Sequence, residues 1–96
     1  LNIKIEKIIK KPLKDVWFNI YKGKNATIYS NYGNRWYPNL GIYDKELNLL
    51  KLIKRDKKTK KADVKFPKNS KYLRVSDIYQ ISNLKNGFKI ILKGKE

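Results

Sequence analysis

The sequence contains no cysteine and no histidine. Without thiols the chain forms neither disulfides nor a thiolate metal cluster, and without imidazole it lacks the side chain that most often titrates near neutral pH. Its apolar runs are only a few residues long, so none is predicted to span a bilayer, and no signal peptide is recognisable. We therefore expect no cofactor and no insertion into a membrane.

Acidic residues are also scarce. The 96 residues include 8 Asp and Glu but 24 Lys and Arg, which gives a formal net charge of +16. Glutamate occurs only at Glu6, Glu46 and Glu96. A nucleotide bias toward A and T would raise the lysine count, but it would raise the acidic count as well. A charge this far from zero repels itself in the folded state and favours a polyanionic partner, of which nucleic acid is the commonest inside cells.

The remaining composition is that of a folded protein. Hydrophobic residues make up 41% of the chain and aromatic residues 12%. Disordered chains lack such bulky apolar side chains. A chain of 96 residues supports one small core, so we expect a single domain over residues 1–96.

The N-terminal third has the patterns of β-strands. Apolar and polar residues alternate over residues 1–9, which predicts a half-buried strand. Residues 16–21 and 26–32 are rich in β-branched and aromatic side chains. The turn residues Gly23-Lys24-Asn25 between them predict that these two runs pair as a hairpin.

The middle of the chain is more polar. Residues 35–43 include Pro38 and Gly41, so a strand there is expected at a sheet edge, at a bulge or in two pieces. We prefer a strand over residues 47–54 to a short helix capped by Asp44. Residues 55–61 then form a hairpin tip, which places a basic hairpin at about residues 51–74.

At the C-terminal end, Asn86-Gly87 fits a two-residue turn between strands at residues 81–84 and 88–92, because both turn residues tolerate positive φ. Phe88, Ile90 and Leu92 then share one face. Ser76-Asp77 could start a single helical turn. Six or seven short strands with frequent turns predict a mainly β protein, a small antiparallel barrel of the SH3-like or OB-like kind, with at most one short helix.

Basic residues concentrate between residues 51 and 74, where eleven of them face only Asp56 and Asp63. A mobile hairpin tip could place several of these ammonium groups near successive phosphates, and each neutralised phosphate would release a counterion. The alternative is a solvated loop that keeps the protein soluble. The candidate phosphate contacts are Lys51, Lys54, Arg55, Lys57, Lys58, Lys60, Lys61, Lys65 and Arg74.

Aromatic residues concentrate between residues 17 and 43, which hold eight of the twelve. If Phe18 faces the core, Trp17 and Tyr21 face outward, where rings stack on bases or sugars. Arg35 is next to Trp36 and Tyr37 in the sequence, and its guanidinium can both stack on a ring and pair with a phosphate. The alternative is that these rings fill the core. The candidate stacking residues are Trp17, Tyr21, Tyr29, Tyr32, Trp36 and Tyr37.

One catalytic pattern is present. Asp63-Val64-Lys65 matches the acid-x-Lys arm of a metal-dependent nuclease, in which Asp44 or Asp56 would complete a Mg²⁺ site. A chain so rich in lysine contains such a triplet by chance, so we do not expect an enzyme.

The sequence therefore predicts a non-catalytic protein that binds DNA or RNA. Only three arginines are present, so specific reading of guanine is not expected and sequence preference should be limited. A cytoplasmic, nucleoid-associated or virion-associated location would follow. The alternatives are a secreted or surface domain that binds anionic glycans or other polyanions, and a structural subunit of a nucleoprotein or virion assembly. Exposed strand edges leave a homodimer or another assembly partner open.

Overall fold

A computed structural model describes residues 2–20 and 22–95. The described residues form antiparallel strands and one short 3-10 helix, which confirms the prediction of a mainly β protein. The elements are β1 (Asn2–Ile9), β2 (Val16–Asn19), β3 (Gly23–Ser30), β4 (Pro38–Tyr43), β5 (Leu49–Lys54), β6 (Lys61–Lys65), β7 (Tyr72–Asp77), η1 (Ile81–Leu84) and β8 (Phe88–Lys95).

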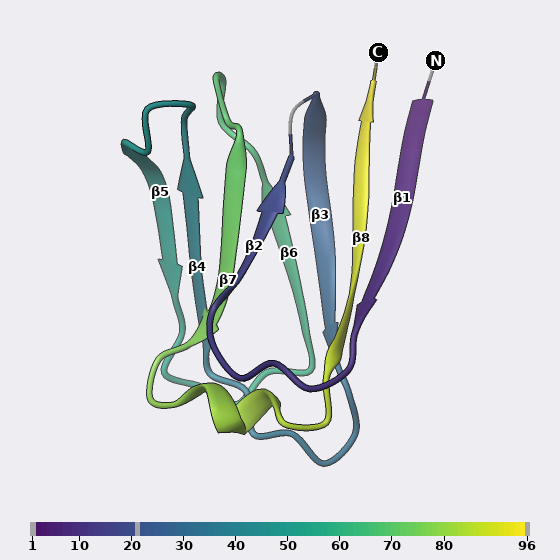
Figure 1. Cartoon of the computed structure of the whole chain (residues 1–96), viewed down its shortest axis with the longest axis vertical. Helices are drawn as coiled ribbons and strands as arrows, with labels where there is room; N and C mark the ends of the chain where they lie inside the picture. The colour runs from purple at the N-terminus through teal and green to yellow at the C-terminus, as the bar shows by residue number, and fades with distance from the viewer. Residues whose placement is uncertain (1, 21, 96) are drawn as a thin grey trace.

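The strands form two four-stranded sheets, which we call sheet I (β1-β8-β3-β6) and sheet II (β2-β7-β4-β5). In Figure 1 sheet II lies to the left and sheet I to the right, and η1 lies at the end of the molecule opposite the start of β1. No strand pairing between the two sheets is recorded in the described part of the chain. The SH3-like or OB-like barrel therefore stays a prediction.

Strands that follow each other in sequence mostly lie in different sheets. β2 pairs with β7, whereas β3 pairs with β6 and β8, so the predicted hairpin around Gly23-Lys24-Asn25 is wrong. β5 and β6 also lie in different sheets, so the basic hairpin expected at about 51–74 is wrong and residues 55–60 connect the two layers. Turn residues specify where a chain reverses, but the pairing partner depends on which inward side chains pack together.

The turn at Asn86-Gly87 forms, but it follows η1 instead of joining two paired strands. Gly87 has a φ of 84°, and its N–H donates to the Leu84 carbonyl over 2.8 Å. Glycine has no Cβ and adopts positive φ without a steric penalty, so it permits the turn that the Asn86-Gly87 pattern predicts. The single helical turn expected from Ser76-Asp77 begins at Ile81 instead.

The core fills the space between the two sheets. Phe88, Ile90 and Leu92 share the inward face of β8, as predicted. The Phe18 ring of sheet II meets the Phe88 ring of sheet I edge-on at 6.2 Å between centroids. Full burial of each such side chain contributes about 1.5–3 kcal/mol.

β4 is an interior strand of sheet II, between β7 and β5, and not the edge strand that Pro38 suggested. Pro38 is tolerated because it is the first residue of the strand, where its missing N–H breaks no regular ladder. Its carbonyl accepts a hydrogen bond from the Arg55 N–H over 3.0 Å. The register shifts by one residue between the pairs Ile42–Lys51 and Tyr43–Leu49, so the extra residue is Leu50 on β5, and the bulge expected within residues 35–43 lies on the neighbouring strand instead.

Candidate nucleic-acid interface

The outer face of sheet I is rich in lysine. Directly opposed residues of antiparallel strands point to the same side of the sheet. Lys93 on β8 therefore lies beside Lys4 on β1, and Lys89 lies beside Tyr29 on β3. We call this surface the lysine face; its lysines are Lys4, Lys61, Lys65, Lys89, Lys93 and Lys95.

Two carboxylates lie in the row between these lysines. The Glu6 carboxylate is 3.9 Å from the Lys89 ammonium group. The Asp63 carboxylate accepts a hydrogen bond of 2.6 Å from the Thr27 hydroxyl. Six ammonium groups thus share the face with two carboxylates, so it keeps an excess of positive charge that an anionic partner can neutralise.

Tyr29 lies between two of these lysines. The Lys89 ammonium is 4.9 Å from the centre of the Tyr29 ring, and the Lys61 ammonium is 5.8 Å from it. Both amines lie over the ring, where cation–π attraction holds them. The result is a half-buried ring with a positive charge on each neighbouring strand; a base or sugar that stacks on the ring would take the place of an amine, which could then pair with a phosphate.

A cleft of about 460 Å³ adjoins the end of this face. It is formed by residues 30–34, which begin at the last residue of β3, and by residues 58–60, which precede β6. The Ser30 N–H donates to the Lys60 carbonyl over 2.9 Å, so the two walls are joined. Lys58 and Lys60 line the cleft together with Tyr32, whose side chain is 97% exposed.

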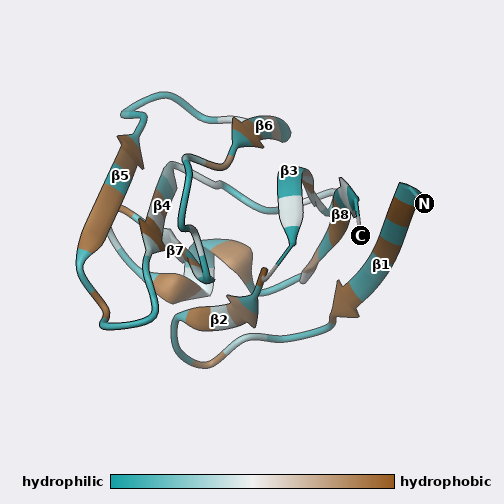
Figure 2. Ribbon diagram, turned by 90° about the horizontal axis from the view of Figure 1, so that it is seen from above, coloured by the Kyte–Doolittle hydropathy of each residue, from teal (hydrophilic) through white to brown (hydrophobic). Residues whose placement is uncertain are grey.

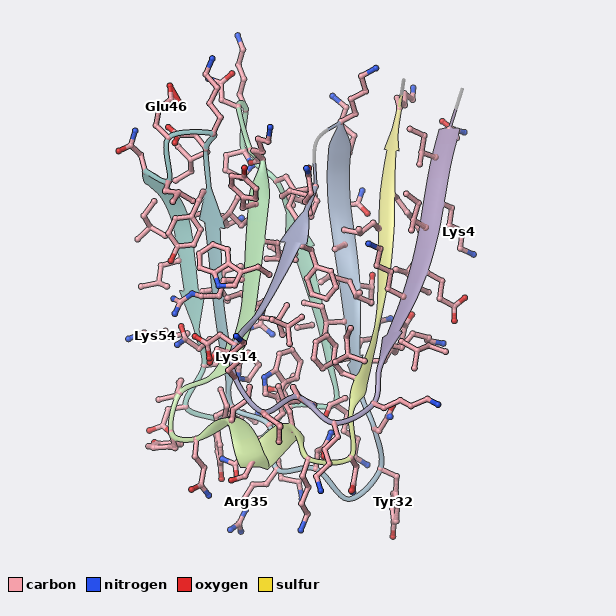
Figure 3. All side chains as sticks on the ribbon, in the orientation of Figure 1. Lys4, Lys14, Tyr32, Arg35, Glu46 and Lys54 are labelled. Atoms are coloured by element: carbon pink, nitrogen blue, oxygen red, sulfur yellow. The ribbon has the colours of Figure 1, made fainter. Side chains whose placement is uncertain are left out.

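Hydrogen bonds between two loops fix the position of Tyr32. The Asn86 side chain donates to the Tyr32 carbonyl over 2.9 Å, and the Asn31 side chain donates to the Asn86 carbonyl over 2.8 Å. The Asn34 side chain donates to the Gly87 carbonyl over 2.8 Å. Figure 3 shows the Tyr32 side chain pointing away from the body of the molecule. Because the Tyr32 backbone is held by the neighbouring loop and its ring is open to solvent, the ring is accessible for stacking on a base.

Several of the predicted basic residues lie at the lysine face or at its cleft. Lys61 and Lys65 belong to the face itself, and Lys58 and Lys60 to the cleft. Arg55 and Lys57 lie on the same connection between β5 and β6. The Lys51 ammonium donates to the Lys65 carbonyl over 3.3 Å, so it links the neighbouring edges of the two sheets.

Other predicted residues lie elsewhere. Lys54, Arg74 and Trp17 are on the outer face of sheet II, on the opposite side of the core. Arg35 lies on the loop between β3 and β4 and points away from the molecule in Figure 3. Tyr21 lies outside the described residues.

The structure overturns the prediction that Trp36 is an outward stacking residue. Trp36 is fully buried, and its indole Nε1–H donates to the Ser76 carbonyl over 2.9 Å. The partner satisfies the polar end of the ring, so the core gains a large apolar side chain without an unpaired donor. Tyr37 is half-buried and packs edge-on against Tyr79 at 5.1 Å between centroids.

Three residues of the lysine face were not predicted from the sequence: Lys4, Lys89 and Lys93. They belong to the first and last strands, which are adjacent only after the chain has folded. The alternation of residues 88–92 was the available signal, because it places Lys89 and Lys93 on the face opposite the core-facing Phe88.

The carboxylates of the nuclease pattern lie on separate elements. Asp63 is on β6 and bonded to Thr27, while Asp56 accepts a hydrogen bond from the Tyr79 hydroxyl, which raises the pKa of Tyr79. Asp44 follows β4, and hydrogen bonds from the Asn48 backbone and side chain lower its pKa. Among residues 2–20 and 22–95, no group of three His, Cys, Asp or Glu side chains could hold a metal ion.

No protein-family model matches the sequence, and no curated protein is significantly similar to it. No helix in the described part of the chain is both long enough and apolar enough to cross a membrane.

Proposed function

We propose that this protein binds nucleic acid without catalysing a reaction, and that the lysine face and its adjoining cleft contact the phosphate backbone. The observation that supports this most is Tyr29 between Lys61 and Lys89. It combines a ring for stacking with two cations on adjacent strands. Tyr32 adds a second ring beside Lys58 and Lys60.

The dimensions of the lysine face suit a few consecutive phosphates. Neighbouring strands are about 4.8 Å apart and residues along a strand rise by about 3.4 Å, so the four strands span about 14 Å and Lys89 and Lys93 are also about 14 Å apart. Lysine side chains are long and flexible, which allows them to follow a backbone without fixing its sequence. Each phosphate contact releases counterions, so affinity should fall steeply with salt.

Low sequence specificity follows from the side chains that are present. The lysine face contains no arginine, whose planar guanidinium most often reads guanine. Stacking on Tyr29 and Tyr32 tolerates any base, because every base has a π-face. We retain the prediction of a small SH3-like or OB-like barrel and of a cytoplasmic, nucleoid-associated or virion-associated location; both are compatible with this proposal.

The test compares two double variants that remove the same charge. In K61Q/K89Q both substitutions lie on the lysine face, whereas in K45Q/K68Q they lie on the β4–β5 and β6–β7 loops. The slope of log affinity against log salt for a labelled oligonucleotide should fall by about 1.5 in K61Q/K89Q, since each phosphate contact contributes about 0.7–0.9. The control variant should keep the wild-type slope. Equal slopes for both variants, with unchanged melting temperatures, would contradict the proposal.

A further inference from the structure

The outer face of sheet II carries aromatic rings where sheet I carries lysines. Trp17 on β2 lies opposite Arg74 on β7, and Tyr72 on β7 lies opposite Tyr43 on β4. Leu52 on β5 lies opposite Gly41, at the edge of the same face. We call this surface the aromatic face and define it by Trp17, Tyr43, Tyr72, Arg74 and Leu52. Figure 2 shows hydrophobic colour along most of β5, although its side chains are largely exposed.

Two of the rings are in contact and lie close to the sheet. The Trp17 and Tyr43 ring centres are 5.0 Å apart, with 42° between their planes. The Tyr43 ring lies over Gly41, because a Cβ at Gly41 would be 2.8 Å from a carbon of that ring. A larger residue at position 41 would push the ring away. Trp17 is 49% exposed, so the pair offers an accessible aromatic surface.

A cation lies next to the Tyr43 ring and is held by an ion pair. The Arg74 guanidinium carbon is 6.0 Å from the centre of the Tyr43 ring, and its Nη1 donates to the Asp15 carboxylate over 3.2 Å. The Ser76 hydroxyl donates to the other Asp15 oxygen over 2.5 Å. The Arg74 Nε is buried and has no hydrogen-bond partner, so this arginine is held in place mainly by packing and by Asp15.

Further lysines surround the aromatic face. The Lys71 ammonium is 5.7 Å from the Tyr72 ring centre, and Lys54 points outward beside Asn39. A cleft of about 530 Å³ adjoins Trp17, and Lys14, Asp15 and Tyr79 are among the residues that line it. The face thus combines rings, an open recess and several cations. Two carboxylates line the recess: Asp15 is paired with Arg74, and Asp77 is buried and accepts hydrogen bonds from the backbone N–H groups of Tyr37 and Tyr79.

We propose that the aromatic face is a second nucleic-acid surface, which stacks the unpaired bases of a single strand, and that one molecule therefore holds two nucleic-acid segments, one on each side. This inference rests on the proposed function of the lysine face. Rings next to a basic groove are the usual means of binding single strands without sequence preference. A second copy of this chain is a poorer occupant, because two molecules of charge +16 repel each other.

Two separate segments are required because the two faces point in opposite directions. The sheets are about 10 Å apart with the core between them, and each adds a layer of outward side chains. In Figure 3 Lys4 of sheet I and Lys54 of sheet II extend from opposite sides of the molecule. A short oligonucleotide bound to one face therefore leaves the other face open for a second.

The first test uses the two tryptophans, of which Trp17 is exposed and Trp36 is fully buried. Short oligothymidylate should quench the fluorescence of the wild-type protein by stacking on Trp17, and should not quench W17L, in which only Trp36 emits. K61Q/K89Q should still be quenched, because its aromatic face is intact. Equal quenching of wild type and W17L, or none in either, would overturn the proposal.

The second test measures bridging directly. Protein is added to beads that carry one oligothymidylate, and a second, fluorescent oligothymidylate is then added at a protein concentration at which light scattering shows a monomer. Wild type should retain the fluorescent strand. The amount retained by W17S should be at least about tenfold smaller, consistent with the loss of one stacked base. W17F should restore most of the signal, because it keeps a ring at this position.

The outcomes separate the two proposals. If W17S bridges as well as wild type, the aromatic face is not a second surface, whatever the lysine face does. If K61Q/K89Q instead keeps the wild-type salt slope while W17L abolishes quenching, the lysine face is the wrong surface and the aromatic face is the single site. Bridging lost in both W17S and K61Q/K89Q, with each still binding one oligonucleotide, supports two surfaces on one molecule.

Discussion

Lys89 and Tyr29 lie directly opposite each other on β8 and β3, and the Lys89 ammonium is 4.9 Å from the centre of the Tyr29 ring. Lys61 approaches the same ring from β6, on its other side. Two like charges beside one ring repel each other, and an anion bound near them would relieve that repulsion. This arrangement is the physical basis for placing a phosphate backbone on the lysine face.

Tyr32 provides a binding test that leaves folding intact. Its side chain is 97% exposed, so Y32A should leave the melting temperature unchanged. Loss of one stacked base should lower oligonucleotide affinity by about 1–3 kcal/mol, measured by fluorescence anisotropy, and Y32F should restore it. Wild-type affinity in Y32A would remove this residue and the adjoining cleft from the interface.

Gly41 controls the position of the Tyr43 ring. In G41A the new methyl group would be 2.8 Å from a carbon of that ring, so Tyr43 should move away from the sheet and from Trp17. We expect a changed Trp17 emission spectrum and weaker quenching by oligothymidylate, with the salt slope of the lysine face unchanged. An unchanged emission spectrum and unchanged quenching would show that the ring pair does not depend on this glycine.

Asp44 should stabilise the β4–β5 hairpin in a pH-dependent way. Its carboxylate accepts hydrogen bonds from the backbone N–H groups of Glu46 and Asn48, and its pKa is lowered from the usual value of 3.8. The stabilisation is therefore present above pH 3.8 and is lost as the pH falls through the lowered folded-state pKa. D44A should melt below wild type at pH 7, and the difference should shrink in strong acid. A difference independent of pH would rule out the ionised carboxylate as its cause.

Trp36 should act on stability and not on binding. W36F removes the indole donor that satisfies the Ser76 carbonyl and leaves a cavity in the core. The free energy of unfolding should fall by about 2–4 kcal/mol, measured by urea denaturation. At a temperature where the variant is folded, its oligonucleotide affinity should match that of wild type. Weakened binding by a folded W36F would instead place Trp36 in the binding site.

Local patterns in the sequence predicted strands better than they predicted pairing. The alternation of Phe88, Ile90 and Leu92 specifies which side of β8 is buried, because side chains of a strand alternate between its two faces. Gly87 likewise specifies a backbone with positive φ. Neither pattern says which strand lies alongside. β8 pairs with β1 and β3, from the distant N-terminal third, so both pairings had to come from the packing of the whole core.

In the candidate site too, local patterns predicted some residues, while others depend on which strands pair. Lys61 and Lys65 were predicted because they belong to a basic stretch, but Lys4 and Lys93 meet only through the β1–β8 pairing. Trp36 was placed outside because the sequence cannot tell which rings of an aromatic segment turn inward. Burial depends on the rest of the fold: Trp36 precedes β4, and the Ser76 carbonyl of the neighbouring strand β7 provides the partner that its indole requires.

The most direct test of the central claim is fluorescence anisotropy of labelled single-stranded DNA, duplex DNA, matching RNA and heparin, titrated with protein at several salt concentrations. Stacking on Tyr29 and Tyr32 adds a salt-insensitive part to the binding free energy, which heparin lacks because it has no bases. We expect at least one nucleic acid to bind more tightly than heparin of equal charge, with the preference maintained at physiological salt. Equal binding to all four polyanions that disappears as salt rises would contradict the account and leave only a cationic surface.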